Sequence, residues 1–274
     1  MKITLEDALS KGRGEERSFC CHVHDDSNAS ASVNVTKGVW YCYACHANGV
    51  VGDQKIATPR ELLDIMSGET PSRVFADSWL DLFDATGPSP YWSKRFGEET
   101  ATKFRCGTHF ESGLPTYPIR DVSNRILGVV TRHENQTNKY MYPRNTRTST
   151  TFFGNFKPSK VVVLVEGAGD VMAIDQSGIP NHWTVLGCFG SGLHAPQIDL
   201  LSDLSPKVVI AAFDSDNAGF EAIKRAEKQL ANVCPVLSHH WSTVGANDPG
   251  DLKPKERMQS LTNTINKTLY KKYL

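Results

Sequence analysis

The chain has 274 residues, no formal net charge at pH 7 and seven cysteines. No apolar run approaches the roughly 18 residues of a membrane-spanning helix, and residues 1–17 lack the apolar core of a signal peptide. We therefore expect neither a membrane protein nor a targeting segment. An odd number of cysteines, several of them closely spaced, favours metal ligands or free thiols in a cytoplasmic protein over disulfides.

The basic residues are unevenly distributed, although zero net charge argues at first against a nucleic-acid partner. Between residues 120 and 160 the acids are only Asp121 and Glu134. The bases there are Arg120, Arg125, Arg132, Lys139, Arg144, Arg147, Lys157 and Lys160. The segment after residue 252 is also basic. Such stripes beside acidic segments fit a protein that grips phosphates and holds cations, but solvated basic faces explain the charge pattern equally well.

The amino-terminal third predicts short elements. Residues 1–16 have the composition of a short polar helix. Residues 29–35 alternate apolar and polar side chains, and a turn leads to a second strand at 39–42, which predicts a hairpin. Residues 51–88 carry Pro and Gly breaks and one helix at 59–68, so we interpret them as a partly structured linker.

The rest of the chain predicts an α/β fold. Residues 89–155 are mixed, with a helix near 94–104 and strands at 115–121 and 125–133. From residue 160 apolar strands alternate with helices, which predicts a mostly parallel sheet with helices on both faces. The predicted strands are 160–167, 183–192, 207–216 and 233–241, and the helices are 170–178, 196–204 and 218–232.

Two short-spaced ligand pairs predict a zinc ribbon. Cys21-x-x-His24 and Cys42-x-x-Cys45 each allow both ligands to reach one ion from a tight turn. Residues 17–50 are too few to hold a core without a metal. A closed set of four ligands leaves no open position, so we expect one structural Zn²⁺ per chain.

The neighbours of these ligands have other expected roles. Cys20 and His22 do not fit the spacing, and we expect Cys20 in the small core and His22 facing solvent. Rings at Trp40, Tyr41 and Tyr43 could stack on unpaired bases. At least one of these three rings is expected to fill the core of the ribbon instead.

Acidic side chains follow two predicted buried strands. Glu166 ends the first strand, and Asp170 lies one helical turn later. Asp214 and Asp216 end the second strand and, at i and i+2, share a face. In an open parallel sheet the ligand crevice lies outside these carboxyl ends. Converging carboxylates repel one another unless cations share them, and hard oxygen ligands suit Mg²⁺ or Mn²⁺.

Two further features accompany these strand ends. Asp248 and Asp251 lie in a turn after the last strand, and either could join the acidic group. Gly167 and Gly219 are expected to let the backbone turn tightly into the following helices.

These motifs resemble a known family. Glu166-Gly167-x-x-Asp170 and Asp214-x-Asp216-x-x-Gly219 are similar to the TOPRIM motifs of topoisomerases, primases and some nucleases. Residues 91–107, 117–133 and 138–156 resemble the basic half of the bacterial DnaG-type primase core, and residues 19–49 resemble its zinc ribbon. The resemblance covers about residues 17–252 and implies a TOPRIM-type mostly parallel sheet, preceded by a mixed α+β basic subdomain and a zinc ribbon.

The resemblance also implies an activity. Such primases synthesise short RNA primers from ribonucleoside triphosphates on single-stranded DNA. By motif match, Glu166, Asp214 and Asp216 would bind Mg²⁺ or Mn²⁺, with Asp170 and Asp248 as helpers, and all five would be catalytic. The residues matched to template or nucleotide binding are Arg120, Arg132, Lys139, Tyr140, Gly190 and Gly192. The zinc ribbon would help to choose the start site.

The implied organisation has five parts, and it departs from the family pattern in places. The parts are a zinc-ribbon DNA-binding domain (1–50), a linker (51–88), a basic subdomain of the polymerase core (89–158), a TOPRIM catalytic subdomain (159–252) and a basic carboxy-terminal helix (253–274, its helical part about 256–273). Ser215 and Gly250 replace usual family residues, and we expect no helicase-docking domain like that of the family within these residues. The chain resembles a compact phage or plasmid primase, cytoplasmic in a bacterium, that would meet a separate replicative helicase. A TOPRIM nuclease and a non-catalytic recombination mediator are the alternatives.

Overall fold

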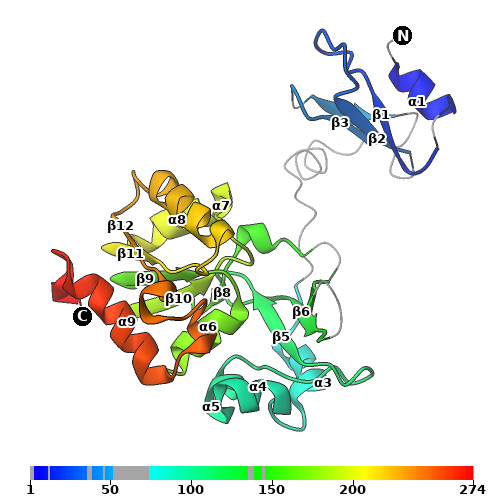
Figure 1. The fold of residues 1–274 in the computed structure, drawn as a ribbon. Helices are drawn as coiled ribbons and strands as arrows, with labels where there is room; N and C mark the ends of the chain where they lie inside the picture. Colours follow the sequence, from blue (N-terminus) through cyan, green and yellow to red (C-terminus); the bar gives the residue numbers. More distant parts are fainter. Residues whose placement is uncertain are drawn as a thin grey trace. The chain divides into compact units, whose positions relative to one another are not determined.

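The computed structural model describes residues 3–11, 13–35, 39–45, 47–51, 74–134, 139–143 and 146–273. These residues belong to two compact units, Met1–Pro71 and Ser72–Leu274 (Figure 1). The helix predicted at 59–68 lies outside the described residues. Among the helices that are described, none is long and apolar enough to cross a membrane.

The first unit is a four-stranded antiparallel sheet with one helix. The helix is α1 (Leu5–Lys11), and the strands are β1 (Glu16–Phe19), β2 (Ala31–Asn34), β3 (Val39–Cys42) and β4 (Asn48–Val50), in the order β1-β2-β3-β4. The predicted hairpin is confirmed, because β2 pairs with β3. Phe19, Val33 and Trp40 are buried with Ala8 of α1. This core is small, as expected for a module stapled by metal.

The second unit contains a five-stranded sheet in the order β12-β11-β9-β10-β8. Its strands are β8 (Phe153–Gly154), β9 (Val161–Val165), β10 (Trp183–Gly187), β11 (Val208–Ala211) and β12 (Val236–Ser238). The last four are parallel, and only the short edge strand β8 runs antiparallel to its neighbour β10. The prediction of a mostly parallel sheet is confirmed.

Helices cover both faces of this sheet, which explains why its strands are apolar throughout. Side chains alternate along β9, so Val161, Val163 and Val165 enter one core and Val162 and Leu164 enter the other. Residues of α6 (Ala168–Asp175) and α9 (Pro254–Asn266) complete the first core. Those of α7 (Ala195–Leu204) and α8 (Asn217–Gln229) complete the second (Figure 1).

A mixed subdomain precedes the sheet. Its three-stranded sheet is formed by β5 (Thr116–Arg120), β6 (Ile126–Arg132) and β7 (Tyr140–Met141). Its helices are η1 (Asp77–Leu80), α3 (Asp81–Asp84), α4 (Pro90–Phe96) and α5 (Glu98–Lys103). The single helix predicted near 94–104 is wrong, because Gly97, with φ of 82°, ends α4 and starts α5. Within the predicted linker, Leu80 and Phe83 pack on β6.

The carboxy-terminal helix is partly buried. It begins at Pro254 and ends at Asn266, and the short turns η2 (Thr148–Thr150), η3 (Trp241–Val244), η4 (Pro249–Asp251) and η5 (Lys271–Tyr273) complete the unit. Arg257 of α9 is buried and donates hydrogen bonds to the carbonyl oxygens of Pro249 and Ala173. This arginine therefore ties η4 to α6 and fixes the turn that carries Asp248.

Gly219 is required by the close approach of its backbone to β11. A Cβ atom at this position would lie 1.9 Å from the carbonyl oxygen of Asp214. At Gly167 a Cβ would meet only Asp170 Oδ2, at 3.7 Å, so the tight turn expected there needs no glycine.

Gly219→Ala should therefore destabilise the protein, although alanine normally favours a helix by about 1 kcal/mol. Displacing the start of α8 should cost about 3 kcal/mol, so we expect a net loss of about 2 kcal/mol in urea unfolding. Gly192→Ala is the control, since its Cβ would lie no closer than 3.8 Å to another atom. Equal stabilities of the two variants would contradict this explanation.

Candidate active site and metal centre

Five carboxylates converge at one edge of the five-stranded sheet. Glu166 directly follows β9, and Asp214 and Asp216 follow β11. Because β9 and β11 are parallel neighbours, their carboxyl ends lie side by side. Asp170 lies in the first turn of α6, and Asp248 caps η4. The negative charges of Glu166, Asp170, Asp216 and Asp248 all raise the pKa of Asp214.

Burial and mutual repulsion disfavour ionisation of this cluster. Burial is the largest cause of the raised pKa of Asp214, about 8, and the four neighbouring carboxylates add to it. Burial also raises the pKa of Asp170 to about 7, with the charges of Asp248 and Glu166 contributing. The pKa of Glu166 is raised by burial and then by Asp216. A bound cation would relieve this repulsion and favour the ionised carboxylates.

Short turns orient three of the carboxylates. Asp170 accepts a hydrogen bond from the backbone N–H of Gly167 (2.9 Å), Asp216 from that of Gly219 (2.8 Å) and Asp248 from that of Gly250 (2.6 Å). Each of these bonds engages one carboxylate oxygen and so fixes the orientation of the group.

One buried oxygen of Glu166 has the environment that a divalent cation would complete. Glu166 Oε1 is buried and has no hydrogen-bond partner among the described residues. A buried acceptor without a partner is costly, and a cation would satisfy it while reducing the repulsion between the carboxylates.

Asp248, rather than Asp251, lies with the cluster. Asp248 influences the pKa of both Asp170 and Asp214. Asp251 is exposed, and its carboxylate accepts a hydrogen bond from the backbone N–H of Asn247 (2.9 Å). The turn after the last strand therefore contributes one carboxylate to the edge of the sheet and uses the other to stabilise itself.

Two of the predicted basic-block residues lie beside the carboxylates. Arg132 Nη1 donates a hydrogen bond to Tyr140 Oη (2.6 Å), and its guanidinium lies over the rings of Tyr91 and Tyr140. The Tyr140 hydroxyl lies 4.0 Å from the position of a Cβ on Gly169, the residue before Asp170. This stacking holds the arginine in place next to the acidic edge.

Arg95 also belongs to this group, and the sequence analysis missed it. Its Nη1 donates to Tyr91 Oη (3.2 Å), and its Nη2 lies 3.5 Å from the position of a Cβ on Gly250. Burial dominates the pKa of Asp170, but the positive charge of Arg95 lowers it. Arg95 lies on α4, ahead of the basic block, and its helical pattern gives no sign of the tertiary contact.

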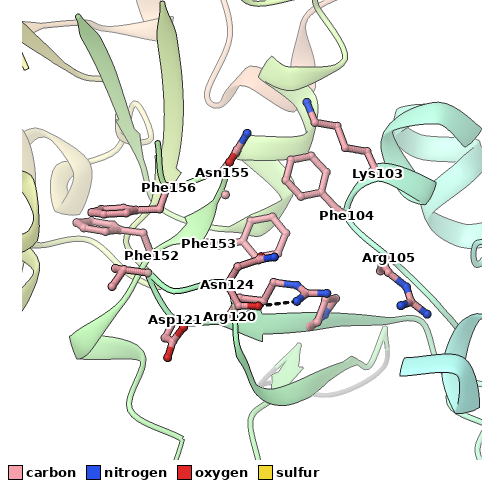
Figure 2. A pocket seen from close by; sticks show the side chains of 13 residues that line it. Lys103, Phe104, Arg105, Arg120, Asp121, Asn124, Phe152, Phe153, Asn155 and Phe156 are labelled. Atoms are coloured by element: carbon pink, nitrogen blue, oxygen red, sulfur yellow. Dashed lines mark hydrogen bonds between the residues drawn. The ribbon is translucent and has the colours of Figure 1, made fainter. Parts of the chain in front are cut away.

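The other predicted nucleic-acid residues are dispersed. Arg120 pairs with Asp77 (2.8 Å) and lines a separate cavity whose lining contains none of the five carboxylates (Figure 2). Lys139 is exposed. Gly190, with φ of 150°, donates its N–H to the carbonyl oxygen of Glu166 (3.0 Å), so its turn lies beside the carboxylates. Gly192 belongs to the same turn, and a Cβ atom at this position would lie 3.8 Å from Arg225 Nη2.

In the first unit the structure brings together Cys21, His24, Cys42 and Cys45. Their ligand atoms all lie within 4.8 Å of one another. The Sγ atoms of Cys21 and Cys45 are 3.7 Å apart, close to the roughly 3.8 Å that tetrahedral geometry gives for Zn–S bonds of about 2.3 Å. The donor set and its spacing fit one tetrahedral ion.

A buried carboxylate that the sequence analysis missed braces this ligand set. Asp26 accepts hydrogen bonds from Cys21 N (2.7 Å) and Ser30 Oγ (2.6 Å). Ser30 Oγ also lies 3.4 Å from Cys42 Sγ. Burial would raise the pKa of Cys42, but hydrogen bonds led by Ser30 lower it to about 6, which favours the thiolate that binds metal. Asp26 thus links the two ligand pairs.

The neighbouring residues lie outside the four-ligand set. Cys20 is partly exposed, and its N–H donates to the carbonyl oxygen of Ile3 (2.7 Å). His22 is exposed and packs against Trp40, with ring centroids 4.7 Å apart. Trp40 fills the core, as expected for at least one of the three rings. Tyr41 and Tyr43 are exposed, and their ring centroids are 5.3 Å apart. His46 lies outside the described residues.

Comparison with protein families matches both parts of the chain. Residues 5–54 match the CHC2 zinc finger family, and residues 163–252 match the Toprim-like family. The first match contains all four clustered Cys and His ligands, and the second contains all five converging carboxylates.

Curated relatives are bacterial DNA primases. The chain is 29% identical to DNA primase of Borreliella burgdorferi over 55% of this chain and 30% of the relative. It is 23% identical to DNA primase of Helicobacter pylori strain J99 over 93% of this chain and 57% of the relative. The chain thus spans between about a third and somewhat more than half of the curated relatives it matches.

Solved structures share the fold. The zinc-binding and RNA polymerase domains of Aquifex aeolicus primase match with a TM-score of 0.53 and 19% identity, over 93% of this chain and 79% of that structure. A DnaG catalytic core matches with the same TM-score and identity over 69% of this chain and 77% of that structure. The chain thus resembles bacterial DNA primases in sequence and a DnaG catalytic core in fold, and its two family matches are a CHC2 zinc finger followed by a Toprim-like domain.

Proposed function

We propose that the chain is a DNA primase that synthesises short RNA primers from ribonucleoside triphosphates on single-stranded DNA. The observation that carries this proposal is the convergence of five carboxylates beside stacked arginine and tyrosine side chains, where one buried carboxylate oxygen has no hydrogen-bond partner within the described part of the chain. The 3′-hydroxyl of one nucleotide attacks the α-phosphate of the next, a new P–O bond forms, and pyrophosphate leaves.

The carboxylates supply the cation site for this reaction. Glu166, Asp214 and Asp216 would hold Mg²⁺ or Mn²⁺, with Asp170 and Asp248 completing the negative field. Bound there, the ions would activate the attacking hydroxyl and neutralise charge on the phosphates. The backbone N–H groups that orient Asp170, Asp216 and Asp248 hold these groups ready before the substrate arrives.

The arginine group supplies the phosphate contacts. Arg95 and Arg132 are held against tyrosine rings at the acidic edge, where the triphosphate of the incoming nucleotide would lie. Arginine forms directional bonds to phosphate oxygens. Exposed Lys139 would add a less directional contact, and the turn at Gly190 and Gly192 would let the nucleic acid approach the backbone closely.

The first unit would read the template. One structural Zn²⁺ on Cys21, His24, Cys42 and Cys45 would hold the ribbon folded. The exposed rings of Tyr41 and Tyr43 are placed to stack on unpaired bases. In this scheme residues 1–50 select the start site, and 51–88 lead into the polymerase core, against which Leu80 and Phe83 already pack. Residues 89–158 and 159–252 form that core, and 253–274 brace it. A separate helicase would supply the unwound template.

Asp214→Asn should abolish primer synthesis, because it removes a metal ligand from the centre of the cluster. In an assay with single-stranded template, ribonucleotides and Mg²⁺ or Mn²⁺, we expect a loss of about 1,000-fold or more with template binding retained. Asp251→Asn is the control, because Asp251 is exposed and its carboxylate accepts a hydrogen bond from the backbone N–H of Asn247. Unchanged synthesis by the Asp214 variant would refute the assignment, and template cleavage without synthesis would indicate a nuclease.

The same substitution should stabilise the metal-free protein at alkaline pH. The pKa of Asp214, about 8, lies above its ordinary value of 3.8, so ionisation destabilises the fold increasingly as pH rises between these values. We expect Asp214→Asn to have a higher Tm than the unmodified protein at pH 9 and a much smaller advantage at pH 5. Mg²⁺ should raise the Tm of the unmodified protein more than that of the variant. An advantage independent of pH would contradict the role of charge repulsion.

Zinc content should follow the four predicted ligands. We expect one zinc ion per chain by elemental analysis, lost in Cys42→Ser and in Cys45→Ser because three ligands hold the ion much less tightly. Cys20→Ser should keep it, since Cys20 lies outside the cluster. Release of zinc by Cys20→Ser alone would show that the ligand set is wrong.

A further inference from the structure

A cavity of about 390 Å³ lies beside the edge strand β8, and nothing in the proposed reaction uses it. Aromatic and basic side chains line it: Phe104, Phe153 and Phe156, with Lys103, Arg105 and Arg120 (Figure 2). They come from the end of α5, from β5 and from the segment around β8. The volume is within the range of small-ligand sites.

The cavity is separate from the carboxylate cluster. None of the five converging carboxylates lines it. Lys103 pairs with Asp175 at the end of α6, whereas Asp170 lies in the first turn of that helix. Five residues of helix separate the two aspartates by about 7.5 Å along its axis. A ligand in this cavity would therefore be held away from the reacting phosphates.

The cations of the cavity are oriented by carboxylates that lie outside its lining. Lys103 pairs with Asp175 (2.6 Å), and Arg105 binds Asp84 through both Nε and Nη2. The one carboxylate in the lining, Asp121, pairs instead with Arg125. The cations are therefore held in place but already paired, Arg105 with Asp81 as well as Asp84, so an anion must replace one of these carboxylates in order to bind.

Arg120 is the cation best able to exchange its partner for an anion. Its ion pair with Asp77 joins it to a carboxylate whose side chain is 66% exposed. Ion pairs of this kind contribute little in water, so a phosphate can replace Asp77 at small cost. A second bond, from Arg120 Nη1 to the carbonyl oxygen of Asn124 (2.8 Å), keeps the guanidinium at the cavity when that exchange occurs.

The rings supply a surface for a planar group. Phe104 stacks on Phe153, with ring centroids 5.3 Å apart and planes 28° apart. Figure 2 shows both rings pointing into the cavity between the basic residues and Phe156. Phe153 is buried in the core, so the partly exposed rings of Phe104 and Phe156 are the ones that a ligand can reach. Aromatic rings next to cations are the combination with which proteins bind unpaired nucleotides, since each base has a face that can stack.

We propose that this cavity binds one nucleotide of the single-stranded DNA template, its base against Phe104 and Phe156 and its phosphate on Arg120 and Lys103. The proposal rests on the proposed primase function and adds to it a template contact outside the reaction centre. Such a contact would hold the template while successive nucleotides are joined.

A binding assay tests this proposal. The affinity of the full chain for a labelled single-stranded oligothymidine is measured by fluorescence anisotropy at several salt concentrations. Arg120→Gln should weaken binding about fivefold or more and reduce the slope of log K against log salt by about 0.7, the loss of one phosphate contact. Lys224→Gln is the control, because Lys224 is an ion-paired cation of α8 and neither it nor its partner Glu221 lines the cavity. It should bind as the unmodified protein does.

Phe104→Leu tests the stacking contact separately. It keeps much of the side-chain volume and the charge, and should weaken binding about fivefold or more without changing the salt slope. The loss should disappear with an abasic oligomer of equal length, since no base remains to stack. If Arg120→Gln binds with unchanged affinity and slope, or Phe104→Leu weakens the abasic oligomer equally, the proposal is wrong.

The two proposals fail in different ways. Primer synthesis by the unmodified protein, together with normal DNA binding by the Arg120 variant, would overturn the cavity assignment alone. Specific loss of DNA binding in the variants, with no primer made by the unmodified protein, would overturn primase activity and support the cavity as a DNA site.

Discussion

Repulsion between carboxylates at one edge of the sheet is the constraint on which the rest of the second unit depends. The parallel strands β9 and β11 deliver Glu166 and Asp214 to the same place, and partial burial deprives them of the water that would screen their charge. Keeping such an arrangement requires rigid support. Gly219 allows α8 to start directly against β11, and Arg257 fixes the turn that carries Asp248. Clusters of carboxylates with strongly perturbed pKa values are typical of functional sites, and cation binding would be the function of this one.

Two sources of positive charge would balance the carboxylates: bound cations and nearby arginines. Bound divalent cations would neutralise the carboxylates from within the cluster, whereas Arg95 and Arg132 approach it from the mixed subdomain. The chain has zero net charge, but its charges are separated: the carboxylates lie at the edge of the sheet and the arginines lie on the adjoining mixed subdomain. In the zinc-finger unit a buried carboxylate supports the ligands instead: Asp26 accepts hydrogen bonds from the backbone N–H of Cys21 and from Ser30 Oγ, which lies 3.4 Å from Cys42 Sγ.

The sequence predicted what depends on local pattern. The buried strands, their order of appearance and the acids at their ends follow from apolar runs and strand periodicity, and the paired spacings at Cys21 and Cys42 limit the metal ligands. What it missed depends on tertiary contacts. Arg95 faces the carboxylates only because α4 packs there, and Arg120, expected with the other phosphate-binding residues, pairs with Asp77 elsewhere. The sequence did not predict that the helix ends at Gly97, because this end depends on the positive φ that the glycine adopts in the structure.

The most direct test of the central claim is a titration of the protein with Mn²⁺, followed by electron paramagnetic resonance of the free ion. If the carboxylates form a cation site, the free-ion signal should be suppressed until the site saturates, and excess Mg²⁺ should restore it. Asp216→Asn should weaken this binding, because Asp216 shares the edge with Glu166. A free-ion signal that rises in proportion to added Mn²⁺ from the start would contradict the account.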